Sequence, residues 1–343
     1  MKILELSQRT HRMRSSAIRE MLRHAAGGGA VMAFTTWMKF VVLTLAVSAF
    51  WTGFFAGMNY ALSFVLIQLL HWTVATKQPA MTAPAMAVKL KDLSAAGAVD
   101  AFVDEVTHLV RSQVAAVVGN LALVAPCVLV ISGALWGIFG RPMIDPVQAG
   151  HVLRSLSLLG PTALFAAFTG VLLFASSIVA GWAENWFVLH RLDSAVRYNP
   201  RITAALGGAR AARWARFMRD NISGLVANIS LGMMLGLIPA IAAFMGLDLE
   251  VRHVTLSTGQ LAAAGASLGL GVLSLTGFWW CVAGLLVTGV LNVGVSFYFA
   301  FRLALRAHNV SGVDRSRINS AIRARALSEP LSFFWPRREP SAG

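Results

Sequence analysis

Apolar residues gather into long uninterrupted runs in this chain, instead of alternating with polar residues as in the strands of a soluble domain. A helix that crosses a bilayer needs about 20 consecutive, mostly apolar residues. Seven runs approach or exceed this length, at positions 31–50, 53–75, 114–139, 158–182, 224–246, 258–276 and 278–300. The pattern therefore predicts an all-α fold, a multi-pass helical bundle in a membrane.

Basic residues between the runs predict how the helices are oriented, because cytoplasmic segments of membrane proteins are enriched in Lys and Arg. Residues 1–30 hold six basic and two acidic residues, residues 183–223 hold seven and three, and residues 301–343 hold eight and three. We expect these three segments, and so both termini, on the cytoplasmic side. Segments 140–157 and 247–257 hold only two and one basic residues and are expected on the far side.

Seven full crossings would separate the two termini, which conflicts with this charge pattern. The run at 258–276 is the least apolar and is rich in Gly, Ala and Ser, and such backbone can re-enter when protein shields its polar groups. We therefore expect about six full crossings plus one re-entrant or broken segment. The predicted organisation is a basic cytoplasmic segment at 1–30, a transmembrane domain at 31–307 with cytoplasmic segments at 76–113 and 183–223, and a basic cytoplasmic tail at 308–343.

The composition limits which classes of protein and of binding site are possible. Of the 343 residues, 57% are hydrophobic and 13% are charged, whereas soluble domains hold about 25% charged residues, so a soluble globular enzyme is excluded. The net charge of +14 favours anionic lipids as partners. Cys127 and Cys281 lie within apolar runs, and His253 has no second ligand at a suitable spacing. We therefore expect no disulfide framework, no metal site and no cofactor.

Glycines at helical spacing predict close packing inside the bundle, because they let helix backbones approach one another. Packing within one chain is the main expectation, and homo-oligomer formation is the alternative, for the pairs Gly53/Gly57, Gly232/Gly236 and Gly265/Gly269. Residues 98–113 form a separate amphipathic pattern that leads into the third run, with Phe102 and Val106 on one side. We expect this segment to dock on the bundle from the cytoplasmic side.

A basic stripe follows the fourth long run. Arginines recur at every third position, with Trp214 and Phe217 among them, at Arg210, Arg213, Arg216 and Arg219. Four arginines with almost no compensating acid are too costly at the bilayer centre for a voltage sensor to be expected. We expect a helix at the cytoplasmic interface, with the arginines on lipid phosphates. DNA or an acidic protein partner is the alternative.

Polar residues at or near membrane depth are the candidates for a ligand pocket, because each is expensive without a purpose. The candidates are Lys77, Gln78, Glu184, Asn185, Asn228, Arg252, His253, Thr255, Ser257 and Gln260. Six hydrogen-bonding side chains within nine residues, from 252 to 260, favour the lining of a pocket. The alternative is structural: charged groups that snorkel, and amides that bond neighbouring helices.

Three long strings carry a resemblance to a known family. They are LHWTVATKQPAMTA at 70–83, FTGVLLFASSIVAGWAENWF at 168–187 and DLEVRHVTLSTGQLA at 248–262. The chain resembles the bacterial transmembrane family named "site-specific recombinase", over nearly its whole length. Members of that family are longer and begin with a soluble helix-rich region, so the chain resembles their membrane-embedded C-terminal part. The resemblance implies the bacterial inner membrane as its location.

The family name implies DNA strand exchange, which the residues do not support. A tyrosine recombinase needs a tyrosine nucleophile with Arg and His around one phosphate. Chance alone gives roughly half a His-x-x-Arg match in a chain of this composition, so the two strings His108–Arg111 and His151–Arg154 are weak signals. In the predicted topology they also lie on opposite sides of the membrane. Tyr60 and Tyr298 fall within apolar runs, which leaves Tyr198. No catalytic residue is predicted, and the chain is not expected to be an enzyme.

Two functions remain. The first is a transport or channel-like role through a polar intramembrane pocket, favoured by broken, glycine-rich spans. The second is a non-enzymatic membrane anchor or scaffold whose basic cytoplasmic faces bind anionic lipid, DNA or a protein partner. The sequence contains nothing that names a substrate.

Overall fold

Helices make up almost all of the protein in the computed structural model, which describes residues 2–74, 98–307 and 312–333. No strand occurs within these ranges. The helices are α1 (Lys2–Thr44), α2 (Ala49–Leu69), α4 (Ala98–Phe139), α5 (Pro146–Leu156), α6 (Thr162–Leu189), α7 (Leu192–Tyr198), α8 (Pro200–Leu206), α9 (Gly208–Phe244), α10 (Val254–Leu268), α11 (Thr276–Ala307) and α12 (Gly312–Ser328). Short 3-10 helices cover Leu270–Ser274 and Pro330–Phe333.

Six of these helices are long and apolar enough to cross a membrane: Glu20–Thr44, Ala49–Leu69, Val99–Phe139, Thr162–Leu189, Gly208–Phe244 and Thr276–Ala304. The remaining predicted run, 258–276, becomes the 15-residue helix α10, which ends at Gly269 with a positive φ of 71°. At 1.5 Å per residue α10 is about 22 Å long, shorter than the roughly 30 Å hydrocarbon core. The prediction of a helical membrane protein with six spans and one broken segment is confirmed.

Several element boundaries differ from the sequence-based ones. Helix α1 runs unbroken through Gly27, Gly28 and Gly29, so no structural break stands at residue 30. A Cβ at Gly28 or Gly29 would fall within 3.0 Å of the carbonyl oxygens of Thr73 and Asn120 respectively, which means that α1 touches neighbouring backbone there. In isolation the glycines resemble a helix breaker, but here they let α1 pack closely on α4. The turn after α1 comes at residues 45–48, earlier than predicted.

Glycines also join α2 to α9, which share the most extensive interface of the fold. A Cβ at Gly236 would fall within 3.0 Å of the backbone of Gly57 and Gly53, and one at Gly232 would meet Ala61. These two pairs therefore pack against each other within one chain, as predicted. The pair at Gly265/Gly269 does not, because Gly265 has only a distant contact to Val272 and Gly269 ends α10.

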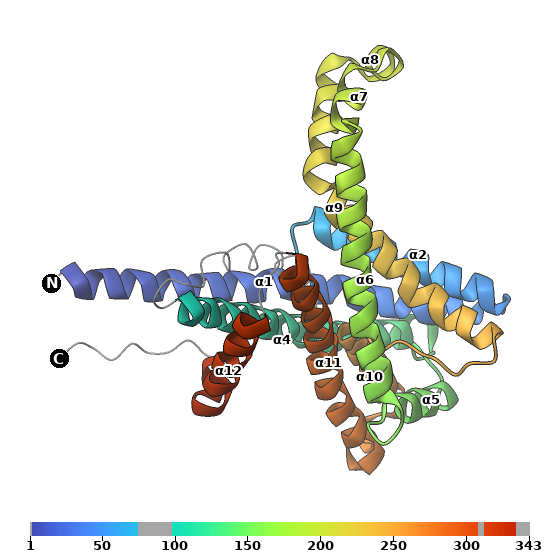
Figure 1. The fold of residues 1–343 in the computed structure, drawn as a ribbon. Coiled ribbons are helices and arrows are strands. Elements are labelled where there is room, and N and C mark those ends of the chain that lie inside the picture. Colours follow the sequence, from blue (N-terminus) through green and yellow to red (C-terminus); the bar gives the residue numbers. More distant parts are fainter. Residues whose placement is uncertain (1, 75–97, 308–311, 334–343) are drawn as a thin grey trace.

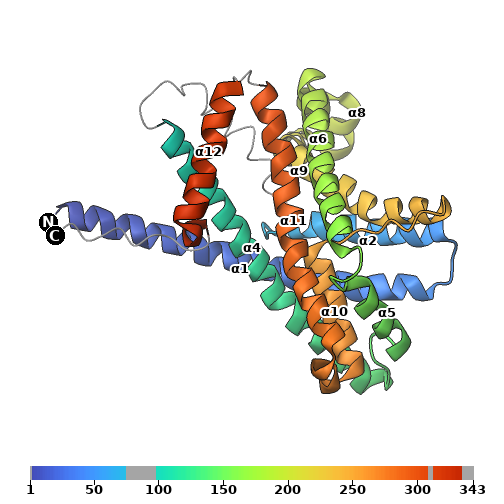
Figure 2. The same cartoon turned by 60° about the horizontal axis from the view of Figure 1, so that its bottom comes forward.

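The long helices cross one another steeply in place of forming a parallel bundle: α6 and α11 stand upright while α1 and α2 lie across them (Figure 1). In a second view of the molecule, turned from the first, α10 and α5 still lie beside the lower part of α11 (Figure 2). Most side chains of α10 are buried, against α1, α4, α5 and α11. This short helix is therefore part of the protein core, where neighbouring helices shield its backbone from lipid.

Residues 98–113 form the first part of α4 and dock as predicted on neighbouring helices. Phe102 and Val106 pack with Ile318 of α12 and with Phe301 of α11. Arg325 of α12 adds an ion pair to Asp104, with 2.7 Å between nitrogen and oxygen. This apolar cluster fixes the start of α4 against the C-terminal helices.

Candidate functional site

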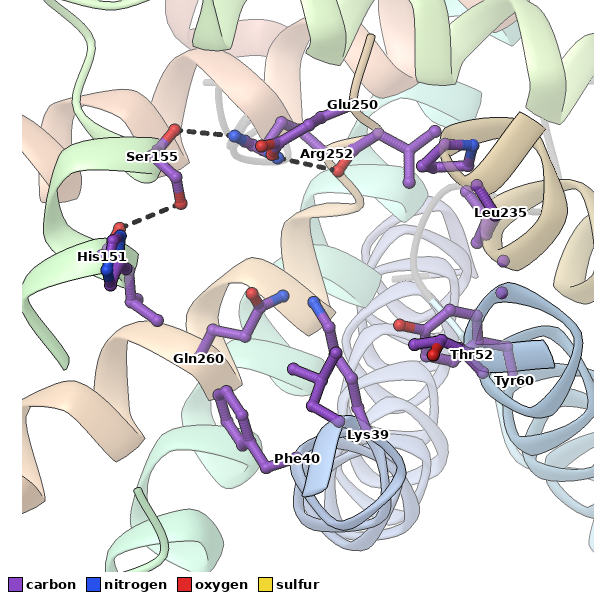
Figure 3. A pocket seen from close by; sticks show the side chains of 18 of the residues that line it. Lys39, Phe40, Thr52, Tyr60, His151, Ser155, Leu235, Glu250, Arg252 and Gln260 are labelled. Carbon is purple, nitrogen blue, oxygen red and sulfur yellow. Dashed lines mark hydrogen bonds and ion pairs between the residues drawn. The ribbon is translucent and has the colours of Figure 1, made fainter. Parts of the chain in front are cut away.

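A cavity of about 530 Å³ opens between spans near the turn that joins α1 to α2 (Figure 3). We call it the first cavity. Residues of α1, α2, α5, α9 and α10 line it, together with the segment 250–252 that leads into α10. Its polar lining side chains are Lys39, Thr52, Tyr60, Gln148, His151, Ser155, Glu250, Arg252 and Gln260. These side chains bring charged and hydrogen-bonding groups from four helices and from the 250–252 segment around one space.

Arg252 holds one wall of the first cavity. Its side chain is only 7% exposed and forms an ion pair with Glu250. One guanidinium nitrogen also donates to the carbonyl of Ser155 at 2.8 Å, and the group lies 5.4 Å from the centre of the Phe165 ring. A buried guanidinium needs such partners to offset its lost hydration. Arg252 therefore joins the 250–252 segment to α5 and α6.

An amide and a hydroxyl group from neighbouring spans fix the backbone behind this wall. Asn292 of α11 is fully buried, and its side-chain nitrogen donates to the carbonyls of Ala166 and Arg252, both at 2.9 Å. Its side-chain oxygen accepts from the backbone N–H of Val254 at 3.1 Å. Thr169 accepts from the backbone N–H of Arg252 at 2.8 Å. These bonds satisfy the backbone where an irregular segment meets the start of α10.

Lys39 and Gln260 point into the first cavity from α1 and α10 (Figure 3). The two helices touch one turn away, because a Cβ at Gly259 would fall within 3.0 Å of the Thr36 hydroxyl. Lys39 makes no hydrogen bond or ion pair within the described part of the chain. Gln260 makes one long hydrogen bond, at 3.4 Å to the carbonyl of Leu256. The ends of both side chains are thus available to a ligand.

A second cavity, of about 480 Å³, lies at the other end of α2. Its polar lining residues are Gln68, His71, Thr73, Glu184, Asp220 and Ser223. The face of α2 that lines it continues the face that lines the first cavity: positions 49, 52, 53, 56 and 60 border the first cavity, and positions 64, 67 and 68 border the second. One stripe of a single helix therefore serves both cavities.

Between the two cavities the packing is tight. Tyr60 and Phe64, one turn apart on α2, are 4% and 1% exposed. The ring centre of His253 lies 5.9 Å from that of Phe64, and Asn228 of α9 donates a short hydrogen bond to Gln68. Burial lowers the pKa of His253 to about 4, which keeps its imidazole neutral at ordinary pH.

The structure divides the predicted pocket residues between several places. Arg252 and Gln260 line the first cavity, and Glu184 lines the second, where its side chain is exposed. Lys77 and Gln78 lie outside the described residues. Asn185 is exposed and borders neither cavity. The others are buried in the packing around α10 and α9, at Asn228, His253, Thr255 and Ser257. The candidates that lie within the described residues do not all line one continuous pocket.

Lys39 and Asn292 were not among the sequence-based candidates. Each is a polar residue inside an apolar run, which by itself is a signal of function or of interhelical bonding. Lys39 stands in the predicted run 31–50 and Asn292 in the run 278–300. Only the fold separates their roles, because Asn292 is saturated with backbone partners whereas Lys39 faces an open space.

The basic stripe lies on a projection that we call the arm, formed by the end of α6, α7, α8 and the start of α9 (Figure 1). All four predicted arginines are exposed there, at Arg210, Arg213, Arg216 and Arg219. Arg219 pairs with Asp193 of α7, with 3.0 Å between nitrogen and oxygen. Trp214 stacks edge to face on Phe217 beside them. An apolar groove of about 620 Å³ runs between α6, α7 and α9.

The residues that a tyrosine recombinase mechanism would use lie on three separate helices. His108 and Arg111 stand on α4, where Arg111 donates to the carbonyl of Ser332 at 2.6 Å. His151 contacts Arg154 within α5, at 3.1 Å between their nitrogens. Tyr198 is exposed at the end of α7, on the arm. Tyr60 borders the first cavity together with His151, whereas Tyr198 lies apart on the arm.

Comparison with known proteins finds a match to a family but not to an individual protein. Neither a curated protein nor a solved structure is significantly similar to the chain. The model of the family described as "Site-specific recombinase" matches residues 13–336, which is most of the chain. The protein therefore belongs to the site-specific recombinase family, as a member with six apolar helices that are able to span a membrane.

Proposed function

We propose that this protein moves a small polar solute across the membrane, between the first and the second cavity. The observation that carries the proposal is the stripe of α2 that lines both cavities. A transport path needs polar space that is open toward each side and a short barrier between. Tyr60 and Phe64 are four residues apart, which is about 6 Å along the helix axis. A barrier of one helical turn is short enough to be opened by a small shift of packed helices.

The contacts around this barrier fit a movable element. At Gly57 and Gly236 the α2–α9 interface is mostly backbone, with the flexible side chain of Met233 beside Gly57. Few side chains therefore stand in the way of a small shift of the two helices. Gln68 and Asn228 form a side-chain bond across that interface, at the edge of the second cavity. Such a bond can be exchanged for one to water or to a solute as the helices move.

Accessibility of engineered cysteines tests whether the cavities open to opposite sides. The background replaces Cys127 and Cys281 with alanine, and single variants Thr52→Cys and Ser223→Cys place a thiol in the first and second cavity. A membrane-impermeant maleimide is added to one side of sealed vesicles of known orientation. We expect Thr52→Cys to react from one side and Ser223→Cys from the other. Val290→Cys, at a 71% exposed apolar position of α11, is the unreactive control.

Solute uptake completes the test. Proteoliposomes are incubated in a mixture of small polar solutes, and the solutes that have entered them are compared with those that enter protein-free liposomes. We expect uptake that stops when the thiol of Thr52→Cys is modified, because the maleimide occupies the first cavity. Modification from the same side at both positions, or uptake no greater than in protein-free liposomes, contradicts the transport proposal.

A second function is supported by a different observation, the four exposed arginines of the arm. In this proposal the protein is a membrane scaffold whose arm holds a phosphate-bearing partner such as DNA, in keeping with the family's description. The test is binding of detergent-solubilised protein to duplex DNA across a salt series. We expect a steep salt dependence that flattens when all four arginines are replaced by glutamine. No binding at physiological salt contradicts this role.

A further inference from the structure

We infer that the first cavity binds a small monovalent organic anion of the carboxylate class, with the ammonium group of Lys39 as its charge partner. The inference rests on the proposed transport function and names the class of its substrate. It also assigns a role to a residue that the sequence pattern left unassigned.

The balance of charge in the first cavity carries the inference. Three side chains of charged type border the space, the cations Lys39 and Arg252 and the anion Glu250. Arg252 and Glu250 neutralise each other in a direct ion pair. Lys39 then remains as an ammonium group that forms no direct ion pair among the described residues. A cation held at the end of a span is stabilised by a counter-charge, and one negative charge on a ligand supplies it.

The donors of Arg252 explain why Lys39 is the recognition group. One terminal nitrogen of Arg252 faces Glu250 and the carbonyl of Val251, and the other donates to Ser155. A ligand that paired with this guanidinium would have to break bonds that hold the wall of the cavity. The Lys39 ammonium group makes no hydrogen bond in the described part of the chain, and its flexible stem can follow a ligand.

The surroundings of Lys39 favour an organic anion over a bare halide. The space of about 530 Å³ is far larger than a single ion requires, and Phe40, Leu235 and Pro239 offer it an apolar border. The Gln260 amide faces the same space as Lys39 (Figure 3) and can donate to a carboxylate oxygen. A carboxylate with a short apolar or hydroxylated body matches this combination of one cation, one amide and an apolar wall.

The net charge of the cavity lining, one positive charge, also limits how many negative charges a ligand can carry. Glu250 is 44% exposed and lies beside the ion pair at the border of the cavity. A second carboxylate on the ligand would meet this like charge, which opposes binding. Monocarboxylates are therefore expected to bind more tightly than dicarboxylates of similar size.

Binding measured on the purified full chain tests the inference without any need for flux. The probes are the sodium salts of acetate and lactate, titrated at constant ionic strength, with the neutral amides acetamide and lactamide as size-matched controls. We expect the carboxylates to bind at least tenfold more tightly than their amides. Lys39→Gln is expected to weaken carboxylate binding at least tenfold, whereas Lys39→Arg keeps it within a few-fold. Arg141→Gln, an exposed arginine outside the cavity, is the matched control for charge.

The outcomes separate the inference from the transport proposal. Equal affinity for amides and carboxylates, retained affinity in Lys39→Gln, or full displacement by chloride at equal concentration overturns the anion site. Carboxylate binding that depends on Lys39 but gives no uptake into proteoliposomes supports the site and contradicts transport. Uptake of solutes that does not depend on their charge or on Lys39 supports transport and overturns the anion site. The Lys39→Arg variant distinguishes loss of charge from loss of folding.

Discussion

Asn292 is expected to be a main support of the first cavity, and its replacement by leucine is the sharpest test of the fold described above. The side chain is fully buried and makes three hydrogen bonds to the backbone, to Ala166, Arg252 and Val254. Leucine keeps the branched shape of the side chain and a high helix propensity, but its methyl groups are larger than the amide atoms that they replace. The change therefore removes the bonds and adds some crowding.

The size of the effect follows from the number of bonds. A typical intramolecular hydrogen bond contributes about 0.5 to 1.5 kcal/mol, and side-chain bonds between membrane helices average about 0.6 kcal/mol. Three bonds therefore predict that Asn292→Leu lowers the free energy of unfolding by about 2 to 4 kcal/mol. Thr169→Val removes the acceptor for the Arg252 N–H and the bond that Thr169 donates to the carbonyl of Phe165 within its own helix. About 1 to 2 kcal/mol is expected for that variant.

The assay is equilibrium unfolding of purified protein in mixed micelles of mild detergent and dodecyl sulfate. Asn185→Leu is the matched control, because Asn185 is exposed and the same substitution there removes no buried bond; its effect is expected to stay below about 0.5 kcal/mol. If Asn292→Leu is destabilised by less than about 1 kcal/mol, or by no more than Asn185→Leu, the assignment of Asn292 as the clamp on this segment is refuted.

Two further predictions concern packing and pH. Gly236→Val is expected to lower the free energy of unfolding by about 1 to 3 kcal/mol, because its Cβ would meet the backbone of Gly57; Gly137→Val, where nothing lies within 4 Å, is the control in the same unfolding assay. We also expect the protein to lose stability in acid because of His253. The pKa of His253 is about 4 in the folded protein and 6.5 in an ordinary histidine, so between these pH values only the unfolded chain takes up a proton. Unfolding measured from pH 7.5 to 4 should show full stability above about pH 6.5 and a decline of about 3 kcal/mol toward pH 4; His253→Phe should flatten this dependence, and an equally steep decline in that variant speaks against the assignment.

Much of the fold can be predicted from the sequence because a bilayer imposes a length and a composition on every span. The run at 258–276 differed from the others in its small polar residues, and these are the residues that the structure buries in α10. The glycines at 27–29 were a different case. Their local pattern resembles a break in α1, and only the backbone of Thr73 and Asn120 against them explains the unbroken helix.

The candidate site was less predictable than the fold. Clustered polar residues at 252–260 indicated a segment that does border the first cavity, but their side chains divide between cavity wall and core. Single polar residues inside apolar runs carry the same signal whether they bind a ligand or a neighbouring helix. Lys39 and Asn292 illustrate this, because their difference lies in contacts with helices far away in the sequence.

The unbroken course of α1 has a mechanical consequence. A helix resists bending and compression along its axis, so its 43 residues act as one stiff rod of about 65 Å. Lys39 stands near one end of this rod, and the first turns of the rod lie before the span that begins at Glu20. A force or a bound partner that displaces those first turns therefore shifts Lys39 relative to Gln260. The rod gives the region outside the membrane a direct mechanical connection to the first cavity.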